Sequence, residues 1–473
     1  MPAPLFARAG PGAGVGWAIA ASFSALALAA ATLWNVQAAL GLVILAGVGI
    51  AVALSPTAIL PILIATVFVE MVHVGGVRIT RLVAPLAMLV VLAAASRKGT
   101  ELRPASPLFW ACGYALWALA SGTWTVHVGG TVFLLSSLAI CLVYMFAFAM
   151  MLGSRRDLDR ILYAIAISSL LVSILSIFAF LGRPIGPFGA TTLQEGRVQG
   201  ATGDPSFFAA LQLVALPLIL VLANEVKALW LRLALYGTAV LGIASVFSTV
   251  SRGGFLQLLA IIALLLVFPS RRLFASPAQK ALVMLVILAG AVTFFTRYQA
   301  DLAPRLETIL HQGQGGATET ASGRLVIWPA ARDAFDSRPF TGIGYGAFVE
   351  TSVDRLYDTR NTFIGSFKVH PEQVHNTFLG QLAELGIPGL VLFLGLLAST
   401  IRMLRRTATK ARRAGELFVN RVANALLLGI IAWCVGAFFI SAETSRPIWI
   451  AIGICLALPK LIPAEAPAAG PET

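Results

Sequence analysis

Apolar runs long enough to cross a lipid bilayer recur along almost the whole chain, separated by short polar connections. A membrane-spanning helix needs about 20 apolar residues, and by that measure the chain holds about 12 to 14 such runs. They begin near Gly16, Val36, Pro56, Leu82, Pro107, Gly130, Asp159, Pro205, Leu229, Gly253, Gln279, His375, Asn420 and Arg446. The pattern therefore predicts an all-α polytopic membrane protein.

One long stretch breaks this pattern, because residues 297–374 are largely polar and end where a new apolar run begins. The other connections are too short for a soluble domain, so we expect one large outer loop containing short helices. We divide the chain into an N-terminal transmembrane scaffold (1–180), a second membrane domain (181–460) with this loop at 297–374, and a flexible tail (461–473). The scaffold has few polar side chains except Glu70, which we expect to be paired or to reach the interface.

Lysine and arginine near the ends of spans are retained in the cytoplasm, and here they fall on alternate connections. The cytoplasmic groups are Arg97/Lys98/Arg103, Arg155/Arg156/Arg160, Lys227/Arg232, Arg271/Arg272/Lys280 and Arg402/Arg405/Arg406/Lys410/Arg412/Arg413. Both termini are then cytoplasmic, and residues 182–204, 251–252, 297–374 and 443–446 lie outside. Arg78 and Arg81 also fall outside by this count. Either the first spans are miscounted, which we favour, or these two arginines face an anionic ligand.

Composition agrees with this class, since 58% of residues are hydrophobic and 12% are charged. The net charge of +13 is explained by cytoplasmic retention and contact with anionic lipids, so it gives no case for nucleic acid. All four cysteines fall inside predicted spans and indicate neither a disulfide framework nor a zinc site. We interpret the first apolar run as an uncleaved helix, because no convincing cleavage site follows it.

Two outer connections combine an arginine with a predicted helix start. Asp204 is placed to cap a helix with Pro205 in its first turn, where a missing N–H costs nothing, and Arg197 precedes them. At the second connection, Ser251 can cap the next helix, and Arg252 adds a planar guanidinium suited to phosphate. Gly253 and its neighbouring glycine leave room for a ligand. The alternative is that both arginines are solvated or bind lipid headgroups.

Within the large outer segment, residues 321–335 predict a short amphipathic helix that Ser322 would cap. Its apolar stripe consists of Leu325, Trp328, Ala331 and Phe335. Arg324 falls in its first turn, where the exposed amides would suit an acidic residue better, so Arg324 either binds an anion or is solvated. Farther along, the glycines of residues 342–348 lack the strand context of a dinucleotide loop and predict a tight turn.

His375 opens the next apolar run, with Asn376 beside it. Polar residues at three- and four-residue spacing share one face of the helix that follows: Thr377, Gln381, Glu384 and Pro388. Such a stripe must face the protein interior or a wet cavity, and we expect Pro388 to bend the helix. An interfacial histidine is often structural, but its place at the head of a polar stripe favours a catalytic role for His375. His370 is a second candidate.

These residues, in this order, resemble the O-antigen ligase and O-antigen polymerase superfamily of bacterial inner-membrane enzymes. The matching pieces lie between residues 180 and 400: Arg197-x-x-Gly200 with Asp204-Pro205, Ser251-Arg252-Gly253-Gly254, Gly323-Arg324-x-x-x-Trp328, Gly342-x-Gly344, and His375-Asn376 followed by Glu384-x-Gly386-x-x-Gly389. Ser206 departs from the family, which commonly has Asn after Asp-Pro. The resemblance implies a C-type glycosyltransferase-like fold and a glycan donor carried on undecaprenyl diphosphate.

The resemblance also implies transfer of the glycan to a sugar hydroxyl on the periplasmic side, with no nucleotide sugar, metal or other cofactor. Arginines and helix N-termini can stabilise a diphosphate leaving group, which favours Arg252 and Arg324 as catalytic residues. A neutral histidine can accept the proton of the acceptor hydroxyl, which favours His375. The substrate-binding candidates are Arg197, Asn376, Glu384, Ser251, Gly253, Trp328 and His370.

The implied partners are the lipid-linked donor, a glycan or lipid-core acceptor, the bilayer and proteins of envelope polysaccharide assembly. Ligase and polymerase share the donor and differ in the acceptor, so the sequence leaves both open. A transporter would place ionisable residues near mid-membrane, whereas here the polar residues gather at one membrane face. A non-catalytic envelope scaffold is the remaining alternative. We expect a multi-pass inner-membrane protein whose active site faces the periplasm.

Overall fold

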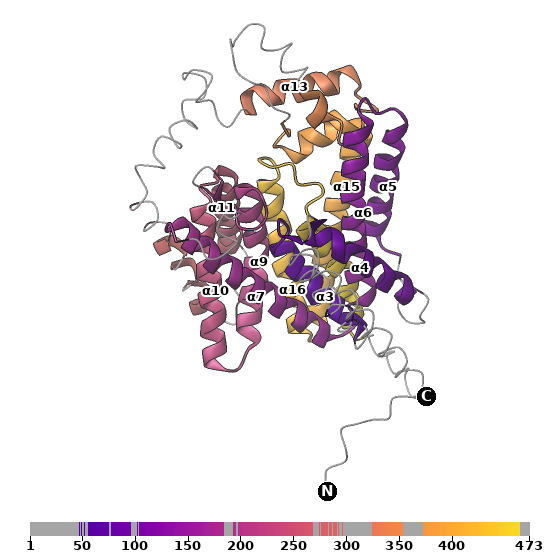
Figure 1. The fold of residues 1–473 in the computed structure, drawn as a ribbon. Helices are drawn as coiled ribbons and strands as arrows, with labels where there is room; N and C mark the ends of the chain where they lie inside the picture. The colour runs from indigo at the N-terminus through magenta and orange to yellow at the C-terminus, as the bar shows by residue number, and fades with distance from the viewer. Residues whose placement is uncertain are drawn as a thin grey trace, which may run out of the picture.

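The protein is a bundle of apolar helices with two very short β-hairpins (Figure 1). The computed structural model describes residues 55–74, 77–95, 104–183, 193–194, 197–267, 276–281, 283–285, 287–290, 324–352 and 372–463, together with isolated residues between these ranges. Six of the described helices are long and apolar enough to span a membrane: α6 (Val128–Met151), α7 (Arg155–Phe180), α9 (Pro205–Glu225), α10 (Leu229–Ser248), α15 (Thr377–Arg413) and α16 (Leu417–Gly436).

Shorter helices complete the bundle. They are α3 (Ile59–Phe68), α4 (Ile79–Ala95), α5 (Ser106–Ala120), α11 (Arg252–Val267), α13 (Arg324–Ser337), α17 (Arg446–Ala457) and the 3-10 turns η1 (Pro56–Ala58), η2 (Ser121–Thr123) and η6 (Leu458–Leu461). The expected all-α polytopic membrane fold is confirmed, and most helices begin within a few residues of a predicted run. The runs near Gly16 and Val36 lie outside the described residues, and the run near Gln279 is described only in part, so the number of spans stays a prediction.

The two hairpins were not expected from the sequence, because strands of two residues have no periodicity to detect. The first pairs β1 (His73–Val74) with β2 (Val77–Arg78), and the second pairs β3 (Leu193–Gln194) with β4 (Arg197–Val198). They meet where the Met71 N–H donates to the Ala201 carbonyl (2.8 Å). Nearby, the Arg81 guanidinium lies 5.4 Å from the centre of the Phe133 ring, near the start of α6. Arg78 and Arg81 thus lie near the hairpin that carries Arg197, and the count of the spans before them stays a prediction.

Helices from the two halves of the chain pack directly against each other. The most buried span is α9, which contacts α7, α10, α11 and α16. On the other side of the bundle, α5 lies along α15 and α6 lies along α17 (Figure 1). The N-terminal helices that we expected to be scaffold therefore also form walls around the helix that begins beside His375.

The polar stripe of α15 faces the interior as predicted, since Thr377, Gln381 and Glu384 are buried. The expected bend at Pro388 needs correction, because the helical backbone breaks at Gly386 (φ 66°, ψ −167°). There the Ile387 N–H donates to the Pro339 carbonyl (2.9 Å), and a Cβ on Gly386 would lie 2.5 Å from the Phe340 carbonyl oxygen. A close approach by a neighbouring turn thus places the break, and only glycine tolerates both the contact and the positive φ.

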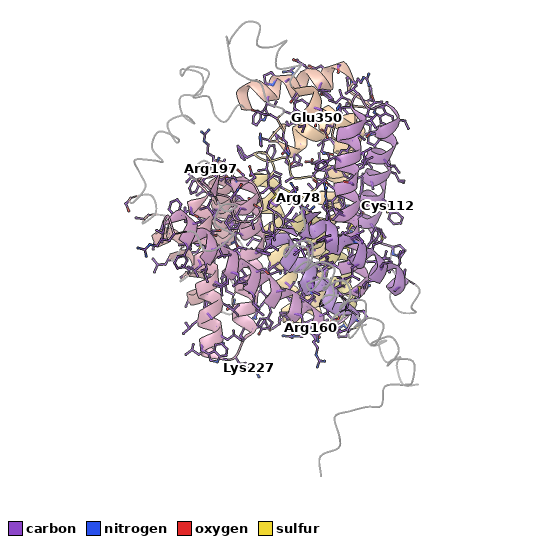
Figure 2. The ribbon with its side chains drawn as sticks, in the orientation of Figure 1. Arg78, Cys112, Arg160, Arg197, Lys227 and Glu350 are labelled. Atoms are coloured by element: carbon purple, nitrogen blue, oxygen red, sulfur yellow. The ribbon has the colours of Figure 1, made fainter. Side chains whose placement is uncertain are left out.

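The expected amphipathic helix is present as α13, which begins at Arg324 and lies across one end of the bundle (Figure 1). Its buried face consists of Ile327, Ala330, Ala331 and Ala334, so the stripe is rotated from the one we predicted. The expected cap, Ser322, lies outside the described residues. In Figure 2, Glu350 lies at the same end as α13, while Arg160 and Lys227 lie at the opposite end. That distribution agrees with the alternation of charge along the sequence.

Candidate active site

His375 lies on a strained turn directly before α15. Its backbone has φ 51°, a left-handed conformation that is uncommon for residues other than glycine. The turn is held from both sides, because the His375 N–H donates to Ser441 Oγ (3.0 Å) and Asn376 Oδ1 accepts from the N–H groups of Phe378 and Leu379 (3.1 Å each). Asn376 is therefore the N-cap of α15. A backbone held in an unfavourable conformation is typical of functional positions.

The segment 437–445, between α16 and α17, organises this end of the bundle. It binds the first residue of α15 three times: the Thr377 N–H donates to the Ala437 carbonyl (2.8 Å), Thr377 Oγ1 donates to the Ile440 carbonyl (2.7 Å), and the Ala442 N–H donates to Thr377 Oγ1 (2.9 Å). The same segment supplies Ser441 to the His375 turn. No motif in the sequence marked this segment as part of a site.

The start of α11 packs against the same segment. Gly253 lies so close to Phe439 that a Cβ there would be 2.9 Å from the phenylalanine Cβ. Ser251 caps the helix as predicted, since its Oγ accepts from the Gly254 N–H (3.1 Å). Arg252 is the first residue of α11 and is half-buried. The glycine therefore allows a helix that begins with an arginine to contact the loop that holds His375.

Arg197 and the loop before α9 join this side of the site. The Arg197 Nε donates to the Thr249 carbonyl (3.1 Å), which ties β4 to the turn before α11. Ser251 Oγ donates to Ser206 Oγ (2.9 Å), so the serine that departs from the family pattern bridges the two capped helices. Asp204 caps α9 as expected, with its Oδ1 accepting from the N–H groups of Ser206 and Phe207.

A cavity of about 330 Å³ lies on the other side of the His375 turn. Its walls come from the start of α6, the 346–350 turn, residues 373–374, the first turns of α15 and the 437–445 segment. Its polar lining consists of Glu350, Gln373, Gln381, Glu384, Ser441 and Glu443. Three of these are carboxylates, and no lysine, arginine or histidine lines the cavity within the described part of the chain. The site residues proposed from the sequence did not include Glu443 or Gln381.

Glu384 holds a wall of this cavity. Its two carboxylate oxygens accept from the N–H groups of Gly346 (2.8 Å) and Phe348 (3.3 Å), and its carbonyl accepts from the Gly344 N–H (2.9 Å). These bonds fix the glycine turn predicted at 342–348, in which Gly342, Gly344 and Gly346 all have positive φ. The carboxylate of Glu384 is thus already engaged by backbone donors, and it also lines the cavity.

Glu443 is the buried carboxylate with the fewest partners here. No other side chain of the described residues forms a hydrogen bond with its carboxylate, although its own carbonyl accepts from Trp449 Nε1 (2.8 Å). Burial raises its pKa from 4.5 to about 7, because the charged form loses its hydration. Its neighbour Arg446 does not share the cavity and instead pairs with Glu70, which confirms the expectation that Glu70 is paired.

The remaining predicted residues are placed only in part. Trp328 of α13 donates through Nε1 to the Val374 carbonyl (3.1 Å), which ties α13 to the residue before His375. Arg324 begins α13, but its side chain lies outside the described part of the structure, as does all of His370. Among the described residues, no group of three or more His, Cys, Asp or Glu side chains is arranged to hold a metal ion.

Comparison with known proteins gives a family match and a curated relative. Residues 237–394 match the family model described as O-antigen ligase. A protein of Rickettsia prowazekii (strain Madrid E) named "Putative polysaccharide ligase" is 28% identical over 116 residues, which cover 24% of this chain and 27% of that protein. The family match runs from the middle of α10 to the middle of α15, so it includes Ser251, Arg252, Arg324, His375 and Glu384. The resemblance expected from the sequence is confirmed.

Proposed function

We propose that this multi-pass membrane protein, whose residues 237–394 match the O-antigen ligase family model, transfers a glycan from undecaprenyl diphosphate to a sugar hydroxyl at the periplasmic face of the bacterial inner membrane. One observation carries the proposal. The 437–445 segment contacts the start of α11 through Phe439, the His375 turn through Ser441, and the cavity through Glu443. A cation for the leaving group, a base and an acceptor site thus adjoin one short segment.

The arginine side suits the diphosphate of the donor. Arg252 stands at the N-terminus of α11, where backbone N–H groups and the helix dipole favour an anion. Arg197 is anchored to the turn directly before it through Thr249. Guanidinium groups can bind phosphate oxygens in pairs and remain charged at every physiological pH. We assign Arg252 and Arg197 to the diphosphate, and Arg324 to the same task from the start of α13.

The cavity suits the acceptor. Its carboxylates would repel a diphosphate, whereas a sugar presents hydroxyl groups that donate well to charged oxygens. Glu443 is available for such a bond, and Gln381 and Ser441 add polar groups beside it. The cavity has the size range of small-molecule sites. We assign it to the acceptor sugar, with the attacking hydroxyl directed toward His375.

The chemistry then requires no group beyond the chain and its substrates. The acceptor oxygen attacks the anomeric carbon of the donor glycan while neutral His375 accepts the hydroxyl proton. The bond between that carbon and the diphosphate oxygen breaks, and undecaprenyl diphosphate leaves with the electron pair. The arginines stabilise the negative charge that grows on the leaving group. Arginine and histidine suffice for this step, so we expect transfer to persist in the presence of a metal chelator.

Reconstitution tests the proposal and separates its alternatives. Proteoliposomes that contain the full chain and a glycan on undecaprenyl diphosphate would receive either a lipid A–core acceptor or a second lipid-linked glycan. Mass spectrometry of the products should show a new glycosidic bond to the lipid core, as expected of a ligase. A lengthened lipid-linked glycan would instead identify a polymerase. Movement of the donor across the bilayer with no new bond would identify a transporter and overturn the proposal.

A further inference from the structure

A basic groove lies at the end of α15 farthest from His375. Its volume is about 360 Å³, and it separates the last turns of α15 from the first turns of α16. One wall is formed by Arg405, Ala408, Thr409 and Arg412, and the other by Asn420, Asn424 and Leu427. The members of each set lie one, three or four residues apart, a spacing that places them on one face of their helix.

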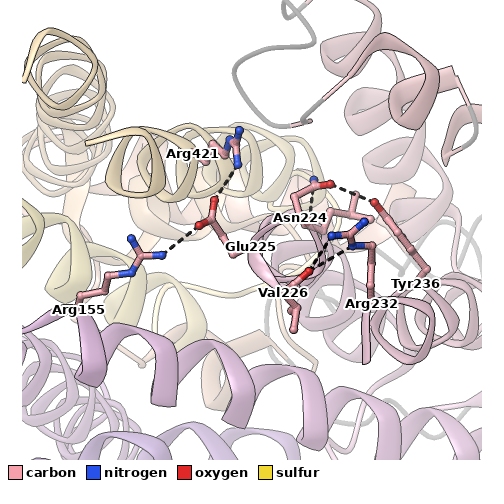
Figure 3. Close-up of polar contacts among 8 residues, drawn as sticks. Arg155, Asn224, Glu225, Val226, Arg232, Tyr236 and Arg421 are labelled. Atoms are coloured by element: carbon pink, nitrogen blue, oxygen red, sulfur yellow. Dashed lines mark hydrogen bonds and ion pairs between the residues drawn. The ribbon is translucent and has the colours of Figure 1, made fainter. Parts of the chain in front are cut away.

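The arginines of this groove differ from other arginines at the same end of the bundle. Arg155 and Arg421 both pair with Glu225, at 3.0 and 2.7 Å, and this network joins α7, α9 and α16 (Figure 3). Arg405 and Arg412 are exposed and form no ion pair with any acidic residue of the described ranges. The cations that hold the fold together are thus neutralised, whereas no acidic residue of the described ranges neutralises those of the groove.

A second basic surface continues from the groove. Arg406, Lys410 and Arg413 line it together with Arg405 and Thr409, and no acidic residue is among them. The last turns of α15 therefore carry cations on most of their exposed sides. If these cations served only to orient the helix in the membrane, their number would be explained. The groove between the two helices would not be.

The opposite wall offers hydrogen-bond acceptors. Asn420 Nδ2 donates to the Ala408 carbonyl (2.7 Å), and Asn424 Nδ2 donates to the Asn420 carbonyl (2.8 Å). Each of these bonds uses one of the two hydrogens on the amide nitrogen, so each asparagine keeps its side-chain oxygen and one N–H for a ligand. A ligand that fits both walls therefore combines an anion, for the arginines, with hydroxyl groups, which can donate to the asparagine oxygens.

The position of the groove identifies the source of such a ligand. After the break at Gly386, α15 continues to Arg413, a length of about 40 Å that exceeds the roughly 30 Å of a hydrocarbon core, so its charged end reaches the lipid headgroups. Ala408 and Leu427 give the groove an apolar part beside its charged part. Basic pockets between membrane helices on the cytoplasmic side bind anionic headgroups.

We propose that the groove between Arg405, Thr409 and Arg412 of α15 and Asn420 and Asn424 of α16 is a binding site for a phosphatidylglycerol headgroup. The phosphodiester lies against the two arginines, and the glycerol hydroxyls donate to the asparagine oxygens. The site is separate from the proposed transfer reaction and holds the far end of α15 against α16 in the membrane.

The test uses the purified full-length chain in neutral detergent after removal of bound lipid. Short-chain phosphatidylglycerol should raise the unfolding midpoint by roughly 2 °C or more, because a ligand that binds only the folded state stabilises it. Short-chain phosphatidylcholine, phosphatidic acid and inorganic phosphate, each at the same ionic strength, should give smaller shifts. An equal shift with inorganic phosphate would indicate a site for free phosphate. An equal shift with phosphatidic acid would show that the glycerol hydroxyls play no part. Stabilisation by a polyglutamate peptide alone would indicate that the groove binds an acidic protein. Each of these results overturns the proposal.

Matched variants locate the effect. Arg405→Gln with Arg412→Gln should abolish the response to phosphatidylglycerol, whereas Arg406→Gln with Arg413→Gln removes the same charge from the same helix and should retain it. Equal loss in both pairs, or loss in neither, contradicts a specific groove. If the first pair does not fold, Thr409→Glu places a negative charge in the groove at an exposed position, and Ala414→Glu is its control at the end of the same helix.

Discussion

The two sides of the proposed active site carry opposite kinds of ionisable residue, although one short segment joins them. On the α11 side, Arg252 and Arg197 stand beside capped helix ends. On the α6 side, the cavity holds Glu384 and Glu443 and no cation among the described residues. A single pocket for one substrate would have no need of this separation. A transferase must hold an anionic leaving group and a neutral sugar at once, and the division of charge suits that task.

Both sides can serve one reaction only if they face the same compartment, and cysteine labelling tests which compartment that is. In a background without Cys112, Cys141, Cys434 and Cys455, we would place single cysteines at Ser337 on α13 and at Ala414 after α15, both of them exposed. In intact spheroplasts, a membrane-impermeant thiol reagent should label Ser337→Cys and leave Ala414→Cys unlabelled until the membrane is opened. The reverse pattern would place the proposed site in the cytoplasm.

His375→Ala should have the largest effect on the reaction. Loss of a general base costs about 100- to 10,000-fold in rate, while the donor should still bind because the arginines hold its diphosphate. His375→Gln keeps a hydrogen-bonding side chain but cannot accept a proton, so it should be nearly as slow. Transfer rates and donor binding, measured separately, would check this. A His375→Gln enzyme close to the wild-type rate would assign the residue to orientation of the acceptor.

Local signals in the sequence predicted the helix ends that border this site. Asp204 and Ser251 cap helices where the apolar runs begin, because capping depends on residues two or three positions away. The cap that Asn376 forms was not predicted. Glu443 was missed because its role depends on contacts with helices far away along the chain. The only sequence signal was an acidic residue in the short gap between two apolar runs. The break at Gly386 was missed for the same reason, since the turn that imposes it comes from residues 339–340.

Arg252→Lys tests the arginine side and should reduce transfer by about ten- to a hundredfold. Lysine keeps the charge but loses the planar pair of donors that fits a diphosphate, and hydrogen bonds to charged groups contribute about 1.5–3 kcal/mol. The loss should appear in the kinetic parameters for the donor, and the acceptor KM should stay unchanged. Arg332→Lys is the control, because Arg332 is an exposed arginine of α13 whose partner is Asp336 (3.5 Å). Equal activity of the two variants would mean that Arg252 does not bind the donor.

Glu443→Gln tests the carboxylate side and should raise the acceptor KM by about tenfold, with the donor KM unchanged, because an amide replaces a charged acceptor.

The pH dependence gives a sharper test. Burial raises the pKa of Glu443 to about 7, so the carboxylate loses its charge progressively as pH falls through that value. The acceptor KM of the wild type should fall as pH rises through about 7, and that of Glu443→Gln should not. A proton-accepting His375 would still lower kcat on the acid side in both enzymes, whereas loss of kcat as pH rises would favour a protonated histidine paired with the diphosphate.

Trp328→Phe should have the smallest effect. It tests how α13 is attached to the turn on which His375 lies. The substitution keeps the ring in place and removes only the N–H that donates to the Val374 carbonyl, one residue before His375. A hydrogen bond of this kind contributes about 0.5–1.5 kcal/mol, so kcat should fall by about two- to tenfold while both KM values stay unchanged. Trp124→Phe removes an equivalent bond, from Nε1 to the Thr341 carbonyl (3.0 Å), and should leave kcat nearly unaltered. If Trp124→Phe slows transfer as much as Trp328→Phe does, both tryptophans serve only the stability of the fold. If only Trp328→Phe is slower, α13 positions the turn on which His375 lies, and the outer segment takes part in catalysis through its packing as well as through Arg324.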